Sequence, residues 1–318
     1  MTAKYNLAKE NLTYYHQKDV GILKISGEDR IDFLHRQSTN DINKVDGNNI
    51  ITSVLTTPNA RIIDVLTIFQ HKESLICITL PFRGQSTYEY LSGKIFFMDK
   101  VEINNFSDEF KIIDIEGITS TSSLANVFTQ IPDLDKFTIL EKYNGGYIGG
   151  QKGIINELSY LIMVNKNGFS ELIEDLTNQS IYELGSKTRE IFRIEAKVPG
   201  FENELIGDFT PLENKLNYAI SNNKGCYTGQ EIIARQVNYD KITKNLAQIQ
   251  LDQIVPIGSK ISANGKNAGL ITSIIDSPKF DVIALAILKR PYFEIDTELQ
   301  IAENNNHVSG KVVNISKH

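Results

Sequence analysis

The stretch from Lys260 to Ile275, KISANGKNAGLITSII, reads as two short strands joined by Asn264-Gly265. Asn-Gly between two apolar runs is a strong local signal for a tight β-hairpin, because both residues accept positive φ angles. Similar short runs surround it: LAQIQL (246–251), DVIALAIL (281–288), ELQIAE (298–303) and VSGKVVNIS (308–316). Closely spaced short strands of this kind are typical of a small antiparallel barrel or sandwich. We therefore expect residues 241–318 to form a C-terminal antiparallel β-barrel domain.

The preceding part of the chain, residues 1–240, mixes strand and helix signals and predicts an α+β fold. The two kinds of segment interleave up to about residue 100, and residues 101–161 are rich in strand signals, with a hairpin connection at Asn144-Gly145-Gly146. No internal repeat is visible in the sequence. We expect one domain over residues 1–240, made of two subdomains that divide near residues 100–160.

The composition narrows the function classes. A chain of 318 residues with a net charge of −6 and no run approaching about 20 apolar residues is expected to be globular and cytoplasmic, with no membrane association. Its acidic balance argues against direct, stable nucleic-acid binding, which normally concentrates Lys and Arg. Two cysteines cannot form a disulfide framework, and the five histidines lie scattered without ligand spacing, so no metal site is expected.

A helix is expected from Ser180 to Ala196, because its apolar residues keep helical spacing up to Ile191 and Ile194. Glu195 follows Ile191 by four residues and therefore lies beside the apolar stripe. A buried carboxylate needs a hydrogen-bonded partner or a ligand. The alternative is that Glu195 lies at a frayed helix end and reaches solvent, and the spacing alone does not separate the two.

The stretch KGCYTGQE, residues 224–231, precedes another helix. Thr228 and Glu231 have the spacing of a capping box, which explains them structurally. Cys226 lies just upstream of the helix N-terminus and close to Lys224, where positive charge lowers the pKa of a thiol and favours a reactive cysteine. A small buried residue packed under the loop is the other reading. Cys77, within the apolar run SLICITL, is expected to be strand core.

Asp41 closes the stretch STND (38–41), directly after a predicted helix that contains His35. Asn40-Asp41 is ordinary turn chemistry, so Asp41 is either a turn former or a candidate site residue. His35 is placed in the middle of the helix on its exposed side, and no nucleophile elbow surrounds a serine. A hydrolase triad is therefore not indicated.

Taken together, these segments resemble the YgfZ group of folate-binding proteins, bacterial relatives of the aminomethyltransferase of the glycine cleavage system. The resemblance rests on DRIDFLHRQSTNDI, TTPNARIIDVLTIF, RIEAKVPGFENEL, TPLENKLNYAIS, KGCYTGQEIIAR and GKNAGLITSIIDSPKFDVIALAILKR, in that order along the chain. KGCYTGQE is the specific element, since aminomethyltransferases have a comparable Lys-x-x-aromatic-x-Gly run without the cysteine. One departure is Lys197, which follows RIEA where the family commonly has glycine.

The resemblance implies a multi-subdomain aminomethyltransferase-like fold around a folate pocket, with ferredoxin-like elements and a C-terminal barrel. By residue matching, Asp41 stands where the transferase has its catalytic aspartate, and Glu195 where the family has a pterin-binding glutamate. Lys224, Cys226 and Tyr227 fall at motif positions at the mouth of that pocket. The implied cofactor is tetrahydrofolate, with Asp41, Glu195, Lys224 and Tyr227 as binding residues and Cys226 and Asp41 as the reactive ones.

Three functions are compatible with this pattern. The first is a tetrahydrofolate-binding accessory protein that supports assembly or repair of iron–sulfur enzymes, including one that thiomethylates tRNA, with those enzymes or assembly proteins as partners. The second is a folate-dependent aminomethyl or one-carbon transferase that uses Asp41. The third is a scaffold that keeps the fold and binds no folate. The cysteine motif favours the first.

Overall fold

The computed structural model describes residues 2–117, 121–303 and 306–314, with seventeen strands and seven α-helices in these ranges. The chain divides into two compact units. We call residues 6–185 and 218–230 the sheet unit, and residues 1–5, 186–217 and 231–318 the barrel unit. The domain assignment expected from the sequence, 1–240 and 241–318, stays a prediction.

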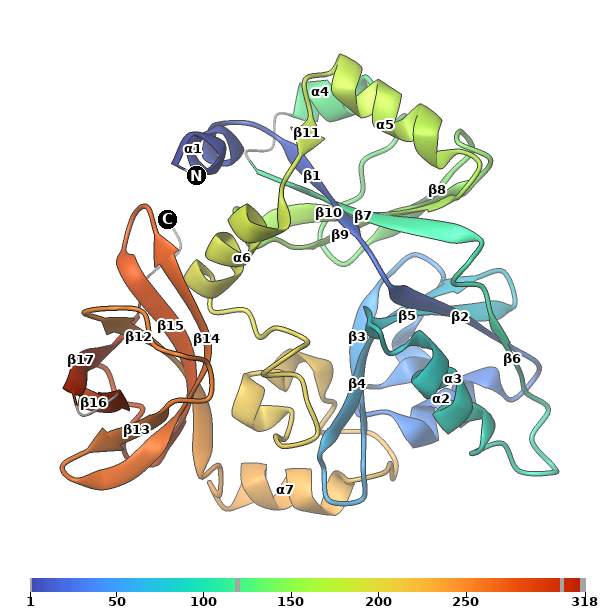
Figure 1. Cartoon of the computed structure of the whole chain (residues 1–318). Helices are drawn as coiled ribbons and strands as arrows, with labels where there is room; N and C mark the ends of the chain where they lie inside the picture. Colours follow the sequence, from blue (N-terminus) through green and yellow to red (C-terminus); the bar gives the residue numbers. More distant parts are fainter. Residues whose placement is uncertain (1, 118–120, 304–305, 315–318) are drawn as a thin grey trace. The chain divides into compact units, whose positions relative to one another are not determined.

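The sheet unit begins with a ferredoxin-like arrangement (Figure 1). Its antiparallel sheet has the order β3-β4-β5-β2-β6. In chain order the elements are β2 (Val20–Ser26), α2 (Arg30–Gln37), β3 (Ile51–Thr56), β4 (Ile62–His71), β5 (Ser74–Pro81), α3 (Gly84–Ser92) and β6 (Glu102–Asn105). Without the edge strand β3 this is a β-α-β-β-α-β unit, so the expected ferredoxin-like elements are confirmed.

The second sheet of the same unit repeats this topology with one exchange. Its order is β11-β1-β7-β10-β9-β8. Its elements are β1 (Thr13–Gln17), β7 (Phe110–Glu116), α4 (Thr121–Ala125), β8 (Phe137–Leu140), β9 (Gly146–Lys152), β10 (Leu158–Asn165), α5 (Phe169–Asn178) and β11 (Tyr182–Glu183). β7, β8, β9 and β10 take the places of β2, β3, β4 and β5, while β1 takes the place of β6. The structure thus contains an internal repeat that the sequence did not show.

Successive side chains along the strands of this unit point to opposite faces of each sheet, so one face packs against helices and the other against the second sheet. Leu75 and Cys77 of β5 belong to the core under α2 and α3, whereas Ile76 faces a second core shared with Ile112 and Met163 of the other sheet. A third core lies between the second sheet and the helices α4 and α5. Burial of each such Ile or Leu contributes about 1.5–3 kcal/mol. The expectation that Cys77 is strand core is confirmed, since its side chain is fully buried.

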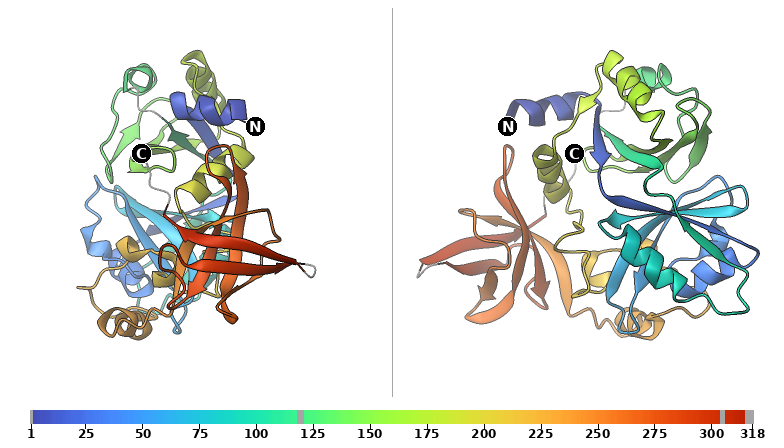
Figure 2. Two further views of the ribbon diagram at one scale, coloured as in Figure 1. Left: turned by 90° about the vertical axis from the view of Figure 1, so that its left-hand side faces the viewer. Right: turned by 45° about the vertical axis from the view of Figure 1, so that its right-hand side comes forward.

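Six strands of the barrel unit close into an antiparallel barrel, as expected (Figure 2, orange to red). They are β12 (Lys244–Leu251), β13 (Lys260–Ala263), β14 (Lys266–Ser277), β15 (Asp281–Lys289), β16 (Glu298–Glu303) and β17 (Asn306–Val313). The predicted hairpin is confirmed, because Ala263 pairs with Lys266 across a turn in which Asn264 and Gly265 have φ values of +50° and +73°. Two positive φ angles define the tight turn that matches strand twist.

Helix α6 (Ser186–Glu195) packs on this barrel within the same unit. Its Ile194 is fully buried in one apolar cluster with Leu246 of β12 and with Leu285 and Ile287 of β15. The helix is therefore attached to the outside of the barrel through apolar side chains.

A buried carboxylate, that of Glu204, follows α6 in the same unit. It accepts hydrogen bonds from Gly200 N at 2.7 Å, from Ser273 Oγ at 2.7 Å and from Arg193 Nη1 at 3.4 Å. Three donors offset the cost of removing the charge from water, whereas loss of one partner of such a buried pair is strongly destabilising. Glu204 thus ties the loop after α6 to both the helix and β14.

The helix expected from Ser180 begins later than the spacing predicted. Ile181 and Leu184 are buried, but Tyr182 and Glu183 form β11, which pairs in parallel with β1. The backbone N–H of Leu184 donates to Tyr14 O at 2.6 Å, so this segment extends the second sheet, and α6 starts only at Ser186. Apolar residues three apart fit a helix as well as a short strand with a following turn, which is why the pattern misled here.

Among the described residues, no helix is long and apolar enough to cross a membrane. The remaining short elements are α1 (Thr2–Glu10), η1 (Ile42–Lys44), η2 (Leu212–Asn214), η3 (Asn217–Ala219) and α7 (Gln230–Asn238).

Candidate functional site

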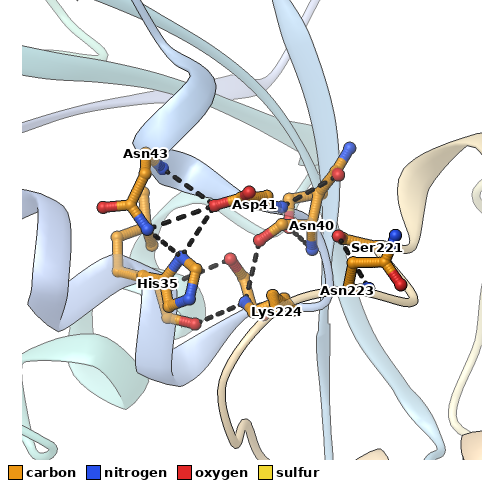
Figure 3. A network of polar contacts seen from close by, with 10 residues as sticks. His35, Asn40, Asp41, Asn43, Ser221, Asn223 and Lys224 are labelled. Atoms are coloured by element: carbon orange, nitrogen blue, oxygen red, sulfur yellow. Dashed lines mark hydrogen bonds and ion pairs between the residues drawn. The ribbon is translucent and has the colours of Figure 1, made fainter.

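The candidate site lies in the sheet unit, where the loop after α2 meets the segment 218–230 (Figure 3). Thr39 holds this segment from one end, since its Oγ1 donates to Ala219 O at 2.6 Å and its carbonyl accepts from Ser221 N at 3.0 Å. Thr56 holds the other end, where its Oγ1 donates to Thr228 O at 2.6 Å. The backbone of the segment is therefore fixed on both sides of Lys224.

The Lys224 ammonium is the centre of the site. Nζ donates to the carbonyl oxygens of His35 at 2.6 Å, Ser38 at 2.6 Å and Asn40 at 2.8 Å. These carbonyls lie at the C-terminal end of α2 and in the loop that follows, where a helix leaves carbonyl groups without intrahelical partners. A cation is also favoured there by the helix dipole. Lys224 thus serves as a C-terminal cap for α2, supplied from a distant part of the sequence.

Burial changes the protonation of this lysine. Desolvation lowers the pKa of Lys224 to about 8, although the negative charge of Asp41 acts in the opposite direction. Nζ also lies 4.8 Å from the centre of the Tyr227 ring, a cation–π contact that favours the charged form. Burial raises the pKa of Tyr227 to about 12, so its phenol stays protonated at neutral pH.

Asp41 is held by two neighbours through one of its oxygens. Oδ1 accepts from Asn43 N at 3.2 Å and from Asn43 Nδ2 at 3.2 Å, and it lies 3.3 Å from His35 Nδ1 (Figure 3). The side chain of Asp41 is 16% exposed. Within the described ranges, no hydrogen bond or ion pair involves Oδ2. Asp41 therefore caps the short helix η1 with one oxygen, and the other remains an acceptor for a ligand.

His35 was missed as a site residue, because the helical pattern placed it on the exposed side of α2. That prediction is wrong: its side chain is only 12% exposed, since Asp41 and Asn43 fold back against it. Burial and the nearby charge of Lys224 lower the pKa of His35, while Asp41 and Asp32 raise it less. A neutral imidazole next to a carboxylate can accept or pass on a proton near pH 7.

Cys226 is exposed, in contrast to its buried neighbour Tyr227. The reading of Cys226 as a residue packed under the loop is therefore excluded. Gly229, three residues after Cys226, is required by space as well as by its φ of +87°, since a Cβ there would lie 2.6 Å from Thr56 Oγ1 and 2.8 Å from Thr57 O. The predicted capping box does not describe Glu231, whose carboxylate binds Arg235 Nη2 at 2.6 Å.

Glu195 belongs to the barrel unit, at the C-terminal end of α6. Its carboxylate accepts from Tyr5 Oη at 3.0 Å and from Ser277 Oγ at 2.5 Å, and the Tyr5 ring stacks on Phe192 at 4.7 Å. Burial and the charge of Glu195 raise the pKa of Tyr5. The carboxylate is thus fixed by two hydroxyl donors at a well-formed helix end. The reading of Glu195 as a residue at a frayed, solvated end is therefore wrong.

The structure brings Asp41, Lys224, Tyr227 and Cys226 onto adjoining segments of the sheet unit, together with the unforeseen His35 and Asn43. Glu195 lies in the other unit, among its own partners. Lys197 of that unit has a φ of +56°, a conformation that glycine adopts most easily. In the parts of the chain that the structure describes, no group of three or more His, Cys, Asp or Glu side chains could hold a metal ion.

A further acidic residue, Asp64 of β4, was also not predicted. Its side chain is fully buried and accepts hydrogen bonds from Thr87 Oγ1 at 2.6 Å, Val65 N at 2.8 Å and Leu80 N at 3.0 Å. Desolvation raises the pKa of Asp64 to about 6 despite these donors. Because two of the donors come from β5 and α3, the carboxylate ties both elements to β4.

Comparison with known proteins agrees with this architecture. Residues 2–224 match the family described as the GCVT N-terminal domain, and the chain belongs to this family. The crystal structure of the glycine cleavage system aminomethyltransferase T from Bartonella henselae has the same fold, with a TM-score of 0.88 over 99% of this chain and 89% of that one, at 15% identity.

Relatives in sequence carry related names. The "Putative transferase, chloroplastic" of Arabidopsis thaliana is 31% identical over 258 residues, which are 80% of this chain and 59% of that protein. The aminomethyltransferase of a Geobacillus species is 24% identical over 92% of this chain and 84% of its own. That of Listeria innocua is 24% identical over 98% of this chain and 88% of its own.

Replacing Lys224 with Met should lower the free energy of unfolding by about 1–3 kcal/mol at pH 7, because three carbonyl groups lose their donor. Lys94→Met is the matched control, since Lys94 also lies over a tyrosine ring, Tyr90, but is exposed. Denaturant unfolding of both variants measures the difference. Equal stability of the wild type and Lys224→Met would show that the ammonium does not hold this loop.

The difference in the free energy of unfolding between the wild type and Lys224→Met should increase with pH. The pKa of Lys224 is lowered to about 8 in the folded chain from its ordinary value of 10.5. Between these values the unfolded chain binds more protons at this residue, so the wild type gains stability as the pH rises through the window. Lys224→Met lacks this gain, and its deficit should therefore widen as the pH rises above about 8.

Proposed function

We propose that the chain binds tetrahydrofolate and supports the assembly or repair of iron–sulfur enzymes in the cytoplasm, including one that thiomethylates tRNA. The observation that carries the proposal is the exposed Cys226, held on a loop that Lys224 and Thr56 fix in place. A thiol on a fixed loop can meet a protein partner without rearrangement. One cysteine cannot hold a cluster alone, so Cys226 would serve as a transient ligand or redox group for a client.

The residues present fit a folate. A pterin ring offers N–H donors on one edge, which suit a carboxylate acceptor, and Glu195 and Asp41 are both carboxylates held in position by neighbouring donors. Tyr227 supplies an aromatic surface beside Lys224. In this proposal Glu195 binds the pterin, and Asp41, Lys224 and Tyr227 contribute to folate binding. Bound folate would supply one-carbon chemistry.

A second candidate function is aminomethyl transfer to tetrahydrofolate. It is favoured by Asp41, whose carboxylate is oriented through Oδ1 while Oδ2 stays available, with the imidazole of His35 beside it. Such a carboxylate can position an amine for attack, and His35 can take up the proton that is released. The relatives named aminomethyltransferase support this candidate.

Folate binding is tested by calorimetric titration of the full chain with tetrahydrofolate. We expect binding to the wild type and a loss of at least about tenfold in Glu195→Ala and Glu195→Gln, since the charged acceptor of the pterin donors is removed. Asp175→Asn is the matched control, because Asp175 also accepts from a tyrosine, Tyr143. Undetectable binding to the wild type would leave only the scaffold reading.

The role of Cys226 is tested by complementation in a strain that lacks this gene. Cys226→Ala and Cys226→Ser should fail to restore the activity of an iron–sulfur enzyme that thiomethylates tRNA, because the ligand or redox thiol is gone. Asn222→Ala, an exposed change in the same loop, should restore it. Full restoration of the iron–sulfur enzyme's activity by Cys226→Ala would contradict the proposed accessory function.

The transferase candidate is tested with a lipoylated, aminomethyl-bearing carrier protein and tetrahydrofolate. If the candidate is correct, the wild type turns over and Asp41→Asn is slower by about 100-fold or more, in the range that removal of an acid–base group costs. Asp46→Asn, a change in the following loop, controls for loss of negative charge. An absence of turnover in both wild type and Asp41→Asn rules this candidate out.

A further inference from the structure

The barrel unit contains a cavity of about 240 Å³ beside the strands β12 and β17. The residues of its wall that matter here are Lys197, Lys215, Asn245, Leu246, Phe293 and Val312. At about 30 Å³ for each water molecule, the cavity has room for roughly eight waters. This is the size of a small metabolite, and Asp41, Glu195 and Lys224 are not in the wall.

The cavity carries positive charge that no described residue neutralises with a carboxylate. Lys197 Nζ donates to the neutral amide oxygen of Asn314 at 3.2 Å. Burial lowers the pKa of Lys197, and the positive charge of Lys215 lowers it further. Across the described residues, neither lysine forms an ion pair with a carboxylate. Two ammonium groups that repel each other across one cavity favour an anion between them.

The backbone at both lysines points to a role for the side chains. Lys197 has a φ of +56° and Lys215 a φ of +62°. Glycine adopts this region freely, whereas a residue with a Cβ is strained there by on the order of 1 kcal/mol. Both positions nevertheless carry a long cationic side chain, and both line the same cavity.

The rest of the wall is largely apolar. Leu246, Phe293 and Val312 offer apolar surface between the polar groups.

From these features we infer that the cavity binds a small organic anion. Lys197 and Lys215 bind its carboxylate or phosphate, and the apolar wall contacts the carbon skeleton. This site is additional to the proposed folate function and does not depend on it.

Calorimetric titration of the full chain tests the site with defined probes. L-Malate and glycerol 3-phosphate represent the carboxylate and phosphate sources, and the tighter of the two identifies the source. Neutral glycerol should not bind. If neither malate nor glycerol 3-phosphate binds at millimolar concentration, the proposal is wrong.

Glycine variants make the test specific to the two lysines. Lys197→Gly and Lys215→Gly suit the local backbone, so they should fold normally and lose about tenfold or more in affinity for the bound probe. Lys72→Gly is the matched control, because Lys72 has a φ of +51° but lies in the sheet unit. Unchanged affinity in both Lys197→Gly and Lys215→Gly would overturn the assignment.

Discussion

The ammonium of Lys224 fixes the geometry of the candidate site. At the C-terminal end of α2 three carbonyl oxygens turn toward one point, and without a donor they would have to be hydrated or strained. The lysine satisfies them from a segment that lies far along the chain. In doing so it determines where the exposed Cys226 and the buried Tyr227 lie. The same burial that makes the ammonium effective also lowers its pKa to about 8, so anchoring and protonation are linked.

Two sheets of one topology give the sheet unit its rigidity. Each buries one face under a pair of helices, and the other faces pack on each other through residues such as Ile76 and Met163. Loops at the ends of such layers are held by a scaffold that is packed on every side, and functional groups are commonly found on loops of this kind. Asp41 follows this rule, since it lies in the connection between α2 and β3, and His35 lies beside it in the last turn of α2.

Short sequence patterns predicted the features that depend on residues close together in the chain. Asn264-Gly265 specified its hairpin, the apolar run around Cys77 placed it in a strand core, and the series of short strands indicated the barrel. The site needed contacts between distant residues. Lys224 reaches carbonyls 184 to 189 positions earlier, and Tyr5 reaches Glu195 across 190 positions. His35 looked exposed on its helix because the loop that covers it cannot be read from helical spacing.

The exchange of β1 for β6 between the two repeats has a consequence for the order in which the molecule is made. The first repeat is contiguous, from β2 to β6, and can fold as soon as it leaves the ribosome. The second is completed by β1, in which Thr13 pairs with Glu116, so the earliest strand of the chain must wait for more than a hundred residues of later sequence. Until β7 has been made, β1 has no partner strand, and an unpaired strand edge is where a growing chain associates with the wrong strand. The contiguous repeat therefore has time to bury its own edges before the interrupted one begins to assemble.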